Sequence, residues 1–182
     1  MEIEIRTKID NLSSFENKIK KLGFKFKKET KQTDQYFGEI NLYKKIGYAF
    51  LMRVRQEKNK CFLTYKGSKL YKDGVWEEYN FEIKNHQQAV KMLEDMGLEK
   101  VISVKKKRKE YFLNNITICL DNIEKLGKFI EIELVSNKAS GKKKLKDLMK
   151  KLGIKENQVI HKGYITMLLK NNKSVYCKYI NH

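Results

Sequence analysis

The chain begins with a strict alternation of charged and apolar residues, Glu2-Ile3-Glu4-Ile5-Arg6-Thr7-Lys8. Side chains in a strand project to alternate faces, so Glu2, Glu4, Arg6 and Lys8 share one face and the isoleucines share the other. This pattern predicts an amphipathic strand. Two interpretations of its polar face are open: a half-exposed strand at the edge of a sheet, or carboxylates neutralised by a divalent cation. Mg²⁺ and Mn²⁺ are the hard ions that bind carboxylate oxygen.

The same alternation of acidic and apolar residues recurs twice. One strand places Glu131 and Glu133 on a single face against aliphatic residues, and another places Glu78, Asn80 and Glu82 together. A helical pattern that ends in an apolar residue and a glycine follows each of the three strands, and glycine suits the left-handed backbone that ends a helix. The three ends are Leu22-Gly23, Met96-Gly97 and Leu152-Gly153. The chain is therefore predicted to consist of strand and helix units whose strands carry acids on one side.

The remaining elements follow from the spacing of apolar residues. Alternation predicts further strands over residues 24–27, continued as extended chain through 32–37, and over residues 49–55, 61–67, 101–113 and 116–121. Helical spacing predicts helices over about residues 12–22, 85–96, 141–152 and 156–170. Tight turns are expected at residues 58–60 and 114–115, and polar loops at residues 38–47 and 68–74. Residues 171–182 have no clear period and are predicted to form a tail.

These elements predict an α+β fold with about eight antiparallel strands and helices packed outside them. Such a strand count suits a closed β-barrel. Because the apolar face of each acidic strand has to pack beneath helices, the charged faces are expected to line the interior. A charged interior is costly unless its charges pair or a ligand and metal ions occupy it. The predicted interior therefore implies a bound polyanion together with metal ions.

The composition limits the class of protein. A length of 182 residues, with 41% hydrophobic and 34% charged residues, predicts one soluble globular domain or at most two small ones. No apolar run approaches the length of a membrane span, and Met1 leads into the charged strand rather than into a signal peptide. The three cysteines lack the spacing of a zinc site or a disulfide framework. These features predict a cytoplasmic protein with no membrane partner.

The formal net charge of +18 calls for an anionic partner, and nucleic acid is the first candidate. The lysines over residues 142–151 lie on a predicted helix, where a solvated surface is the ordinary explanation. The run from Lys105 to Lys109 fits either a solvated basic strand or a nucleic-acid patch. Charge alone therefore does not select the partner.

Basic residues also alternate along the predicted strands. Arg53 and Arg55 share one face, Lys106 and Arg108 share another, and Lys66 lies near the end of a third strand. Guanidinium groups offer planar, bidentate donors that match phosphate oxygens, and lysine acts as a compact point charge. Cations that hold phosphate, together with carboxylates that hold metal, predict a nucleotide or polyphosphate site.

Several short motifs occur in an order that is similar to a known family. Glu2-Ile3-Glu4-Ile5-Arg6 resembles the ExExK signature of the CYTH superfamily, the triphosphate tunnel metalloenzymes, with Arg6 in place of the lysine. The later motifs, within residues 1–169, are Asp34-Gln35-Tyr36-Phe37, Leu51-Met52-Arg53-Val54-Arg55, Leu63-Thr64-Tyr65-Lys66-Gly67, Glu77-Glu78, residues 106–111, Ile118-Cys119-Leu120-Asp121, residues 127–133 and His161-Lys162-Gly163-Tyr164. The family includes class IV adenylate cyclases, thiamine triphosphatases and tripolyphosphatases. The chain is most similar to the CyaB-like cyclase branch.

The resemblance implies a fold and a set of site residues. The fold is an eight-stranded antiparallel tunnel of two similar halves, here a single domain over residues 1–170. The implied ligands of Mg²⁺ or Mn²⁺ are Glu2, Glu4, Glu131 and Glu133, supported by Asp121 and Glu82. The implied phosphate-binding residues are Arg6, Lys8, Arg53, Arg55, Lys66, Lys106 and Arg108. The implied catalytic residues are Glu2, Glu4 and Arg6.

The resemblance also implies a class of reaction. Conversion of ATP to cyclic AMP and pyrophosphate comes first, and hydrolysis of tripolyphosphate or thiamine triphosphate is the alternative. A third hypothesis, from another class, is a protein that binds RNA or polyphosphate without catalysis. Nucleic acid is not the expected partner. Contact with nucleic acid does not need paired glutamates, whereas metal-dependent phosphoryl transfer does. Dimers occur in the cyclase branch, which leaves a homodimer open.

Overall fold

The computed structural model describes residues 2–38, 50–67, 77–135 and 140–169. Within these ranges, the side chains of Glu2, Phe50, Glu77, Ser140 and Lys142 are not described. The predicted loop at residues 68–74 and the predicted tail at 171–182 lie outside the described residues, as does the predicted loop at 38–47 beyond Gly38.

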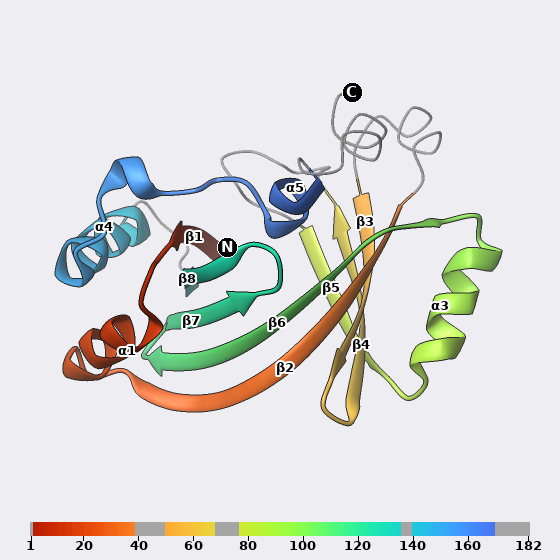
Figure 1. Cartoon of the computed structure of the whole chain (residues 1–182), viewed down its shortest axis with the longest axis horizontal. Helices are drawn as coiled ribbons and strands as arrows, with labels where there is room; N and C mark the ends of the chain where they lie inside the picture. The colour runs from red at the N-terminus through yellow and green to blue at the C-terminus, as the bar shows by residue number, and fades with distance from the viewer. Residues whose placement is uncertain (1, 39–49, 68–76, 136–139, 170–182) are drawn as a thin grey trace. The chain divides into compact units, whose positions relative to one another are not determined.

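In the described residues, eight strands form one sheet with antiparallel pairing (Figure 1). The strands are β1 (Glu2–Lys8), β2 (Lys25–Gly38), β3 (Phe50–Glu57), β4 (Lys60–Gly67), β5 (Glu77–Ile83), β6 (Glu99–Leu113), β7 (Ile116–Ile123) and β8 (Gly127–Val135). Their order in the sheet is β1-β8-β7-β6-β2-β3-β4-β5. The helices are α1 (Leu12–Lys21), α3 (His86–Asp95), α4 (Ser140–Leu152), a 3₁₀ turn η1 (Glu156–Gln158) and α5 (Tyr164–Leu169). The predicted α+β class with eight antiparallel strands is confirmed.

The chain divides into two compact units. The first unit contains Met1–Thr30 and Lys106–His161, and the second contains Lys31–Lys105 and Lys162–His182. Strands β2 and β6 each contribute residues to both units. Each unit has its own apolar core and its own cluster of charged side chains.

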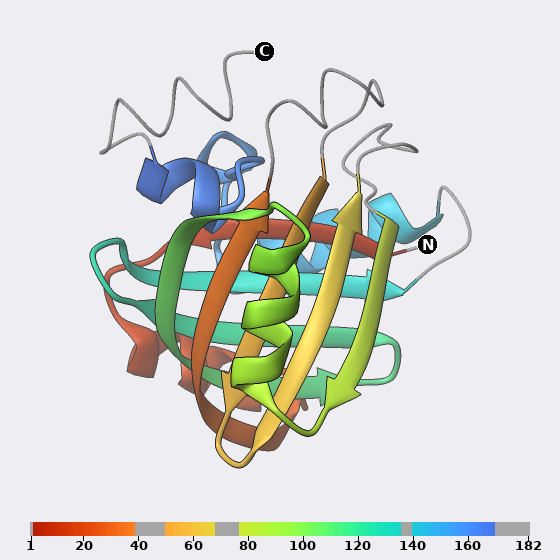
Figure 2. The same ribbon diagram turned by 90° about the vertical axis from the view of Figure 1, so that its right-hand side faces the viewer.

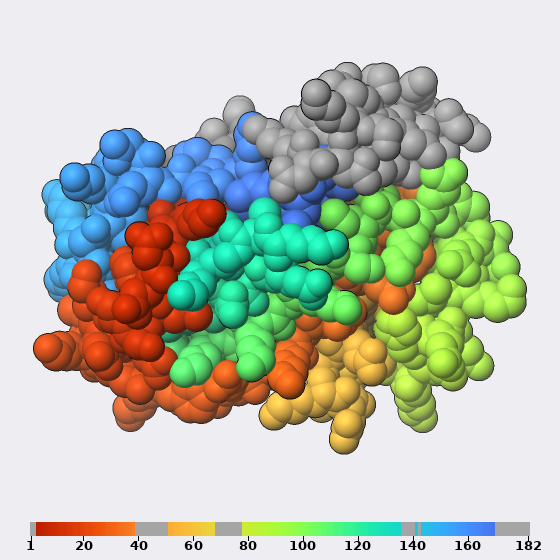
Figure 3. Space-filling view, in the orientation of Figure 1, coloured from red at the N-terminus to blue at the C-terminus, as the bar shows by residue number. Residues whose placement is uncertain are grey.

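The core of the first unit lies on the apolar face of β8. Ile130, Ile132 and Leu134 are fully buried there, and Ile3 and Ile5 of β1 pack against the same core. Helix α4 contacts β8 and α1, and the two helices are neighbours on the surface (Figures 1 and 3). The alternation in the sequence therefore places the apolar faces of β1 and β8 against this core, as predicted.

The core of the second unit forms between the sheet and α3. Helix α3 contacts β3 and β4 and lies across them (Figure 2). Phe37, Val54, Ala89, Leu93 and Leu98 are its buried residues. Since Ala89 and Leu93 are four residues apart, they occupy one face of the helix. The predicted helix over residues 85–96 is confirmed, and Asn85 caps it by accepting a hydrogen bond of 3.1 Å from the backbone N–H of Gln88.

The predicted helix ends are also confirmed. Gly23 follows α1 with a φ of +88°, and Gly153 follows α4 with a φ of +76°. Residues with a Cβ adopt this left-handed backbone only with strain, so glycine ends these helices without a steric cost. Gly97 follows α3 with the same left-handed backbone.

One sequence-based prediction needs correction, and another is confirmed. The extended chain predicted from residues 24–27 through 32–37 is one strand, β2, of 14 residues. The helix predicted over residues 156–170 is wrong in its first half, where η1 is followed by non-helical chain up to α5. The reason is tertiary: the Ile160 N–H donates to the Arg6 carbonyl at 2.8 Å, and the Thr7 hydroxyl donates to the Gln158 carbonyl at 2.8 Å. These bonds hold the segment beside β1 and compete with helix formation.

None of the helices in the described ranges is long and apolar enough to cross a membrane.

The core assignment of the first unit predicts a stability effect. Replacing Ile132, which is 1% exposed, by Ala removes buried methyl groups and leaves a cavity, so the free energy of unfolding should fall by about 3 kcal/mol. Urea denaturation measures the change. Val135→Ala, on the same strand and 60% exposed, is the matched control and should change stability by less than about 1 kcal/mol. Equal effects for the two variants would contradict the assignment.

Candidate functional site

The polar strand faces gather charged side chains into one cluster in each unit. The cluster of the first unit, called the acidic cluster, consists of Glu4, Arg6, Arg108, Asp121, Glu131 and Glu133. It contains four carboxylates and two guanidinium groups. The cluster of the second unit, called the basic cluster, consists of Asp34, Arg53, Arg55, Lys66 and Glu78. It contains three cations and two carboxylates.

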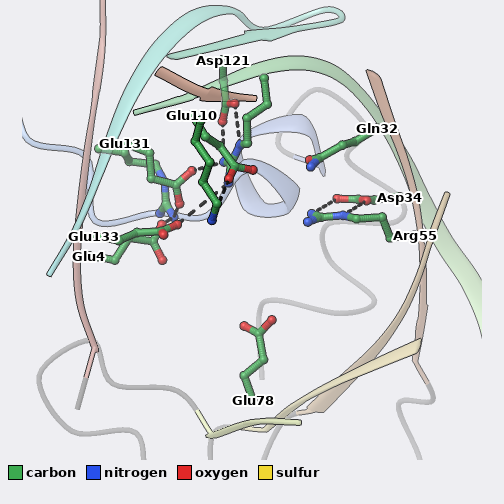
Figure 4. A network of polar contacts seen from close by, with 12 residues as sticks. Glu4, Gln32, Asp34, Arg55, Glu78, Glu110, Asp121, Glu131 and Glu133 are labelled. Carbon is green, nitrogen blue, oxygen red and sulfur yellow. Dashed lines mark hydrogen bonds and ion pairs between the residues drawn. The ribbon is translucent and has the colours of Figure 1, made fainter. Parts of the chain in front are cut away.

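Arg108 is the centre of the acidic cluster. Its Nε and Nη2 donate to the two carboxylate oxygens of Asp121 at 2.7 and 2.6 Å, and Nη2 also donates to Glu131 at 2.5 Å (Figure 4). The Glu133 carboxylate lies 3.9 Å from Nη1. Burial by itself would lower the pKa of Arg108, but the neighbouring carboxylates outweigh it and raise the pKa well above its ordinary value. Arg108 is therefore a permanent cation held by three acids.

Arg6 joins β1 to the same cluster. It lies directly opposite Glu131 in the register of β1 and β8, and its Nη2 donates to that carboxylate at 3.0 Å. Arg6 also forms an ion pair with Glu4 on its own strand. Glu131 therefore bridges two arginines, and each of its two oxygens accepts a hydrogen bond from one of them.

Glu4 and Glu133 form a pair of carboxylates that could hold a metal ion. They lie directly opposite each other on β1 and β8 (Figure 4). Side chains at such positions have Cβ atoms about 5 Å apart, and two like charges there repel unless a cation lies between them. Within the described residues, three or more Asp, Glu, His or Cys side chains do not converge as a metal site, and arginines lie among the acids. The fit to a hard divalent ion therefore rests on this carboxylate pair.

The structure places the other predicted residues of the first unit as follows. Lys106 shares a face of β6 with Arg108 and is 8% exposed. Lys8 lies at the exposed end of β1. Glu2 lies at the start of β1, and its side chain is outside the description.

Cys119 is buried beside the groups of the acidic cluster. Burial and the surrounding carboxylates raise the pKa of its thiol well above the ordinary value, which argues against a thiolate nucleophile.

In the basic cluster, Arg55 is held by Asp34. The two residues lie directly opposite each other on β2 and β3. Nε and Nη2 of Arg55 donate to the two oxygens of Asp34 at 2.6 and 2.7 Å (Figure 4). The Tyr36 hydroxyl donates to Asp34 at 3.4 Å. Burial and the Asp34 charge raise the pKa of Tyr36 to about 12, so this hydroxyl stays protonated at neutral pH.

Arg53 links β3 to the next two strands. Its Nη2 donates to the Thr64 hydroxyl at 2.9 Å and to Glu78 at 3.1 Å, and the Thr64 hydroxyl donates to the Asn80 side-chain oxygen at 2.7 Å. Lys66 forms an ion pair of 2.5 Å with Glu78. Partial burial would raise the pKa of Glu78, but the charges of Lys66 and the two arginines outweigh it and lower the pKa.

The structure brings most of the predicted site residues together within their units, but it separates Glu82 from the acidic cluster. Glu82 shares a strand face with Glu78 but forms an ion pair of 3.0 Å with Lys60, and both side chains are exposed. Its predicted role as a supporting metal ligand gains no neighbouring carboxylate from this placement.

The sequence-based site prediction missed several residues of the basic cluster and its surroundings. Asp34, Thr64, Glu78 and Asn80 were seen only as parts of motifs, yet each holds a cation or a neighbour of one. A signal was present in β2, where the polar residue Gln32, the acid Asp34 and the phenol of Tyr36 alternate with a period of two. Their burial could not be read from that period alone, because it depends on which strands flank β2.

The fold and the two clusters fit a known family, and the chain belongs to it. The CYTH domain family matches residues 1–164. In Methanocaldococcus jannaschii, a protein named "Putative adenylate cyclase MJ0240" is 31% identical over 173 residues, which cover 92% of this chain and 98% of that protein.

Solved structures agree with this family. The PH1012 protein of Pyrococcus horikoshii OT3 is 34% identical, with a TM-score of 0.80 over 91% of this chain and 98% of that chain. The PH1819 protein of the same organism is 26% identical, with a TM-score of 0.78 over 94% of this chain and 99% of that chain. The resemblance noted in the sequence is therefore confirmed at the level of family and fold.

The lowered pKa of Glu78 predicts a dependence of stability on pH. A carboxylate whose pKa is lower in the folded state stabilises the fold above its ordinary value of 4.5, and the contribution is lost as pH falls through the lowered pKa. Between about pH 5 and pH 3, the wild type should therefore lose more stability than Glu78→Gln. Urea denaturation across this range measures the difference. Glu82→Gln removes one charge from the same strand as a control, and identical pH slopes for wild type and Glu78→Gln would contradict the prediction.

Proposed function

We propose that this chain is a metal-dependent enzyme that acts on a triphosphate, with the conversion of ATP to cyclic AMP and pyrophosphate as its reaction. One observation carries the proposal: each unit gathers both carboxylates and cations on the polar faces of its strands. In the first unit Glu4 lies opposite Glu133 beside Arg6 and Arg108, and the second unit contains Arg53, Arg55 and Lys66 in ion pairs with Asp34 and Glu78. Membership of the CYTH family and the name of the Methanocaldococcus relative support the reaction class.

The basic cluster provides the groups that bind phosphate. Arg53 and Arg55 alternate on β3, and Lys66 lies on the neighbouring strand. Each guanidinium is held by an acid or a hydroxyl, so its position is fixed before any ligand arrives. Preorganised cations neutralise phosphate oxygens without the entropy cost of ordering long side chains. Arg6, Lys8, Lys106 and Arg108 are proposed as further phosphate-binding residues of the first unit.

The acidic cluster provides the ligands for Mg²⁺ or Mn²⁺. Glu4 and Glu133 would hold the ion, with Glu2 and Glu131 as further ligands and Asp121 in a supporting role. A metal-binding role for Glu82, which lies in the second unit, stays a prediction from the sequence. A bound divalent ion supplies neutralisation of phosphate charge and activation of the attacking oxygen. Arg6 forms ion pairs with both Glu4 and Glu131, so it sets the position of two of these carboxylates.

In the proposed cyclase reaction, the ribose 3′ oxygen attacks the α-phosphorus and pyrophosphate leaves. The proposed phosphate-binding residues contribute by restraining the triphosphate chain, so that the reacting oxygen and phosphorus are held in line. The cations that bind the β- and γ-phosphates stabilise the charge that builds up on the leaving pyrophosphate. Since Cys119 stays protonated, a covalent thiol intermediate is not part of this mechanism.

Hydrolysis of tripolyphosphate or thiamine triphosphate is the second candidate. The support for it is that ATP, tripolyphosphate and thiamine triphosphate share a triphosphate chain, and the proposed residues would bind that chain and its metal ion rather than an organic group. The same residues would then direct water to the terminal phosphorus.

Three further expectations stay predictions. They are one domain over residues 1–170, a cytoplasmic location and a homodimer.

The decisive test is product analysis. The purified protein should be incubated with ATP, tripolyphosphate or thiamine triphosphate, each with Mg²⁺, with Mn²⁺ or with a chelator. Cyclic AMP and pyrophosphate from ATP are the expected products, and they should disappear with the chelator. Orthophosphate as the only product would replace the cyclase assignment by hydrolysis. Tight polyanion binding without turnover of any of the three would reject an enzyme and favour the binding hypothesis.

The proposed roles predict different defects for the two clusters. Glu133→Gln removes a metal ligand, so activity should fall by roughly 100-fold and recover in part at higher metal concentration. Arg53→Gln removes a phosphate-binding cation, so KM for the triphosphate should rise without a change in metal dependence. Steady-state kinetics with metal titrations separate the two effects. Glu156→Gln, an exposed glutamate paired with Lys146, is the control and should keep wild-type kinetics.

A further inference from the structure

Asp34 is a buried charge that the sequence-based site prediction did not use. It is 0% exposed, and both of its oxygens receive hydrogen bonds from Arg55 on the neighbouring strand. Burying a carboxylate is costly unless it is paired with good geometry. The bidentate pair meets that condition with N···O distances of 2.6 and 2.7 Å. Asp34 is therefore bound by Arg55, and Arg55 is equally bound by Asp34.

The same arrangement occurs in the first unit. Asp121 is also 0% exposed and lies directly opposite Arg108 in the register of β6 and β7. The atoms are the same as in the second unit: Nε donates to one oxygen and Nη2 to the other, at 2.7 and 2.6 Å. Two different strand pairs thus use an identical cross-strand contact, which points to a geometric requirement shared by the two arginines rather than to the local packing of one strand.

The contact has a defined effect on the guanidinium group. By binding Nε and Nη2, the aspartate fixes the plane of the group and directs the opposite edge, with Nη1, away from itself. A free arginine side chain carries about 2 kcal/mol of rotamer entropy, which an anion would otherwise have to remove on binding. Tyr36 contacts Asp34 from the same strand, through a hydroxyl 3.4 Å from Oδ2. Asp34 is thereby restrained from two sides.

We propose that Asp34 is a positioning residue that presets Arg55 for binding to a phosphate group of the substrate and does not itself contact the substrate. This inference rests on the proposed function, since it assumes that Arg55 binds phosphate. The proposal gives Asp34 a favourable role in ligand binding. Its charge alone would predict the opposite, because an acid near an anion site repels the ligand.

The sign of the effect of Asp34→Asn distinguishes positioning from simple electrostatics. Removal of a negative charge near an anion site should tighten the binding of tripolyphosphate if only the net charge matters. Loss of positioning should weaken it, and we expect the dissociation constant to rise about tenfold. Isothermal titration of the full-length protein with tripolyphosphate measures the change. Asp95→Asn removes a charge from an exposed pair with Lys91 and should leave the dissociation constant unchanged.

A double-mutant cycle tests whether Asp34 acts through Arg55. Lysine cannot form the bidentate contact, so Arg55→Lys should weaken binding. Adding Asp34→Asn to Arg55→Lys should then produce no further loss. If Asp34→Asn weakens binding by the same factor in both backgrounds, the effect does not pass through Arg55 and the proposal is wrong.

Because breaking a buried ion pair can unfold the protein, Asp34→Glu provides a second variant. It keeps the charge and lengthens the side chain, so it should displace the guanidinium and weaken tripolyphosphate binding while the thermal midpoint stays close to that of the wild type. Wild-type binding by Asp34→Glu would overturn the proposal. Failure of the wild type itself to bind or turn over any triphosphate would instead reject the proposed function.

Discussion

Charged side chains are buried on one face of the strands, and their pairing governs strand register in both units. Asp34 and Asp121 are fully buried, and Arg53, Lys106, Arg108 and Glu131 are nearly so. Such groups are tolerated only when each one meets an opposite charge at hydrogen-bond distance. The bidentate contacts of Arg55 and Arg108 satisfy this requirement through atoms on directly opposite positions of neighbouring strands. Strand register and charge pairing are therefore tied together, because a shift by one residue would leave buried charges without partners.

The separation of the two faces of each strand explains how a charged site and a stable fold occur in one small protein. In β8, Ile130 and Ile132 belong to the core while Glu131 and Glu133 belong to the acidic cluster. Alternation thus keeps the residues that stabilise the fold distinct from those proposed for chemistry. A change in a cluster residue can alter binding or catalysis without creating a cavity in the core, provided that its charged partner is not left unpaired.

The two units repeat one contact and differ in charge balance. In both units, an arginine donates two hydrogen bonds to a buried aspartate on the neighbouring strand. Around Arg108 two further acids gather, whereas Arg55 shares its strand with Arg53 and has Lys66 on the neighbouring strand. The same cross-strand contact therefore occurs in both units among different neighbours. Carboxylates that suit a metal ion and cations that suit phosphate are the physical basis of the function proposed for this member of the CYTH family.

Features that depend on local periodicity could be predicted from the amino-acid sequence. The alternation of β1 and β8 specified which residues face the core, the glycines after α1, α3 and α4 specified the helix ends, and the ordered motifs identified the family. Tertiary structure decided which charges meet, since Arg6 and Glu131 are 125 residues apart in the chain and no local pattern encodes their register. It also decided the segment before α5, where backbone bonds to β1 replaced the predicted helix. The role proposed for Asp34 could not be predicted from the sequence for the same reason. Its burial and its pairing with Arg55 arise only when β2 and β3 lie side by side.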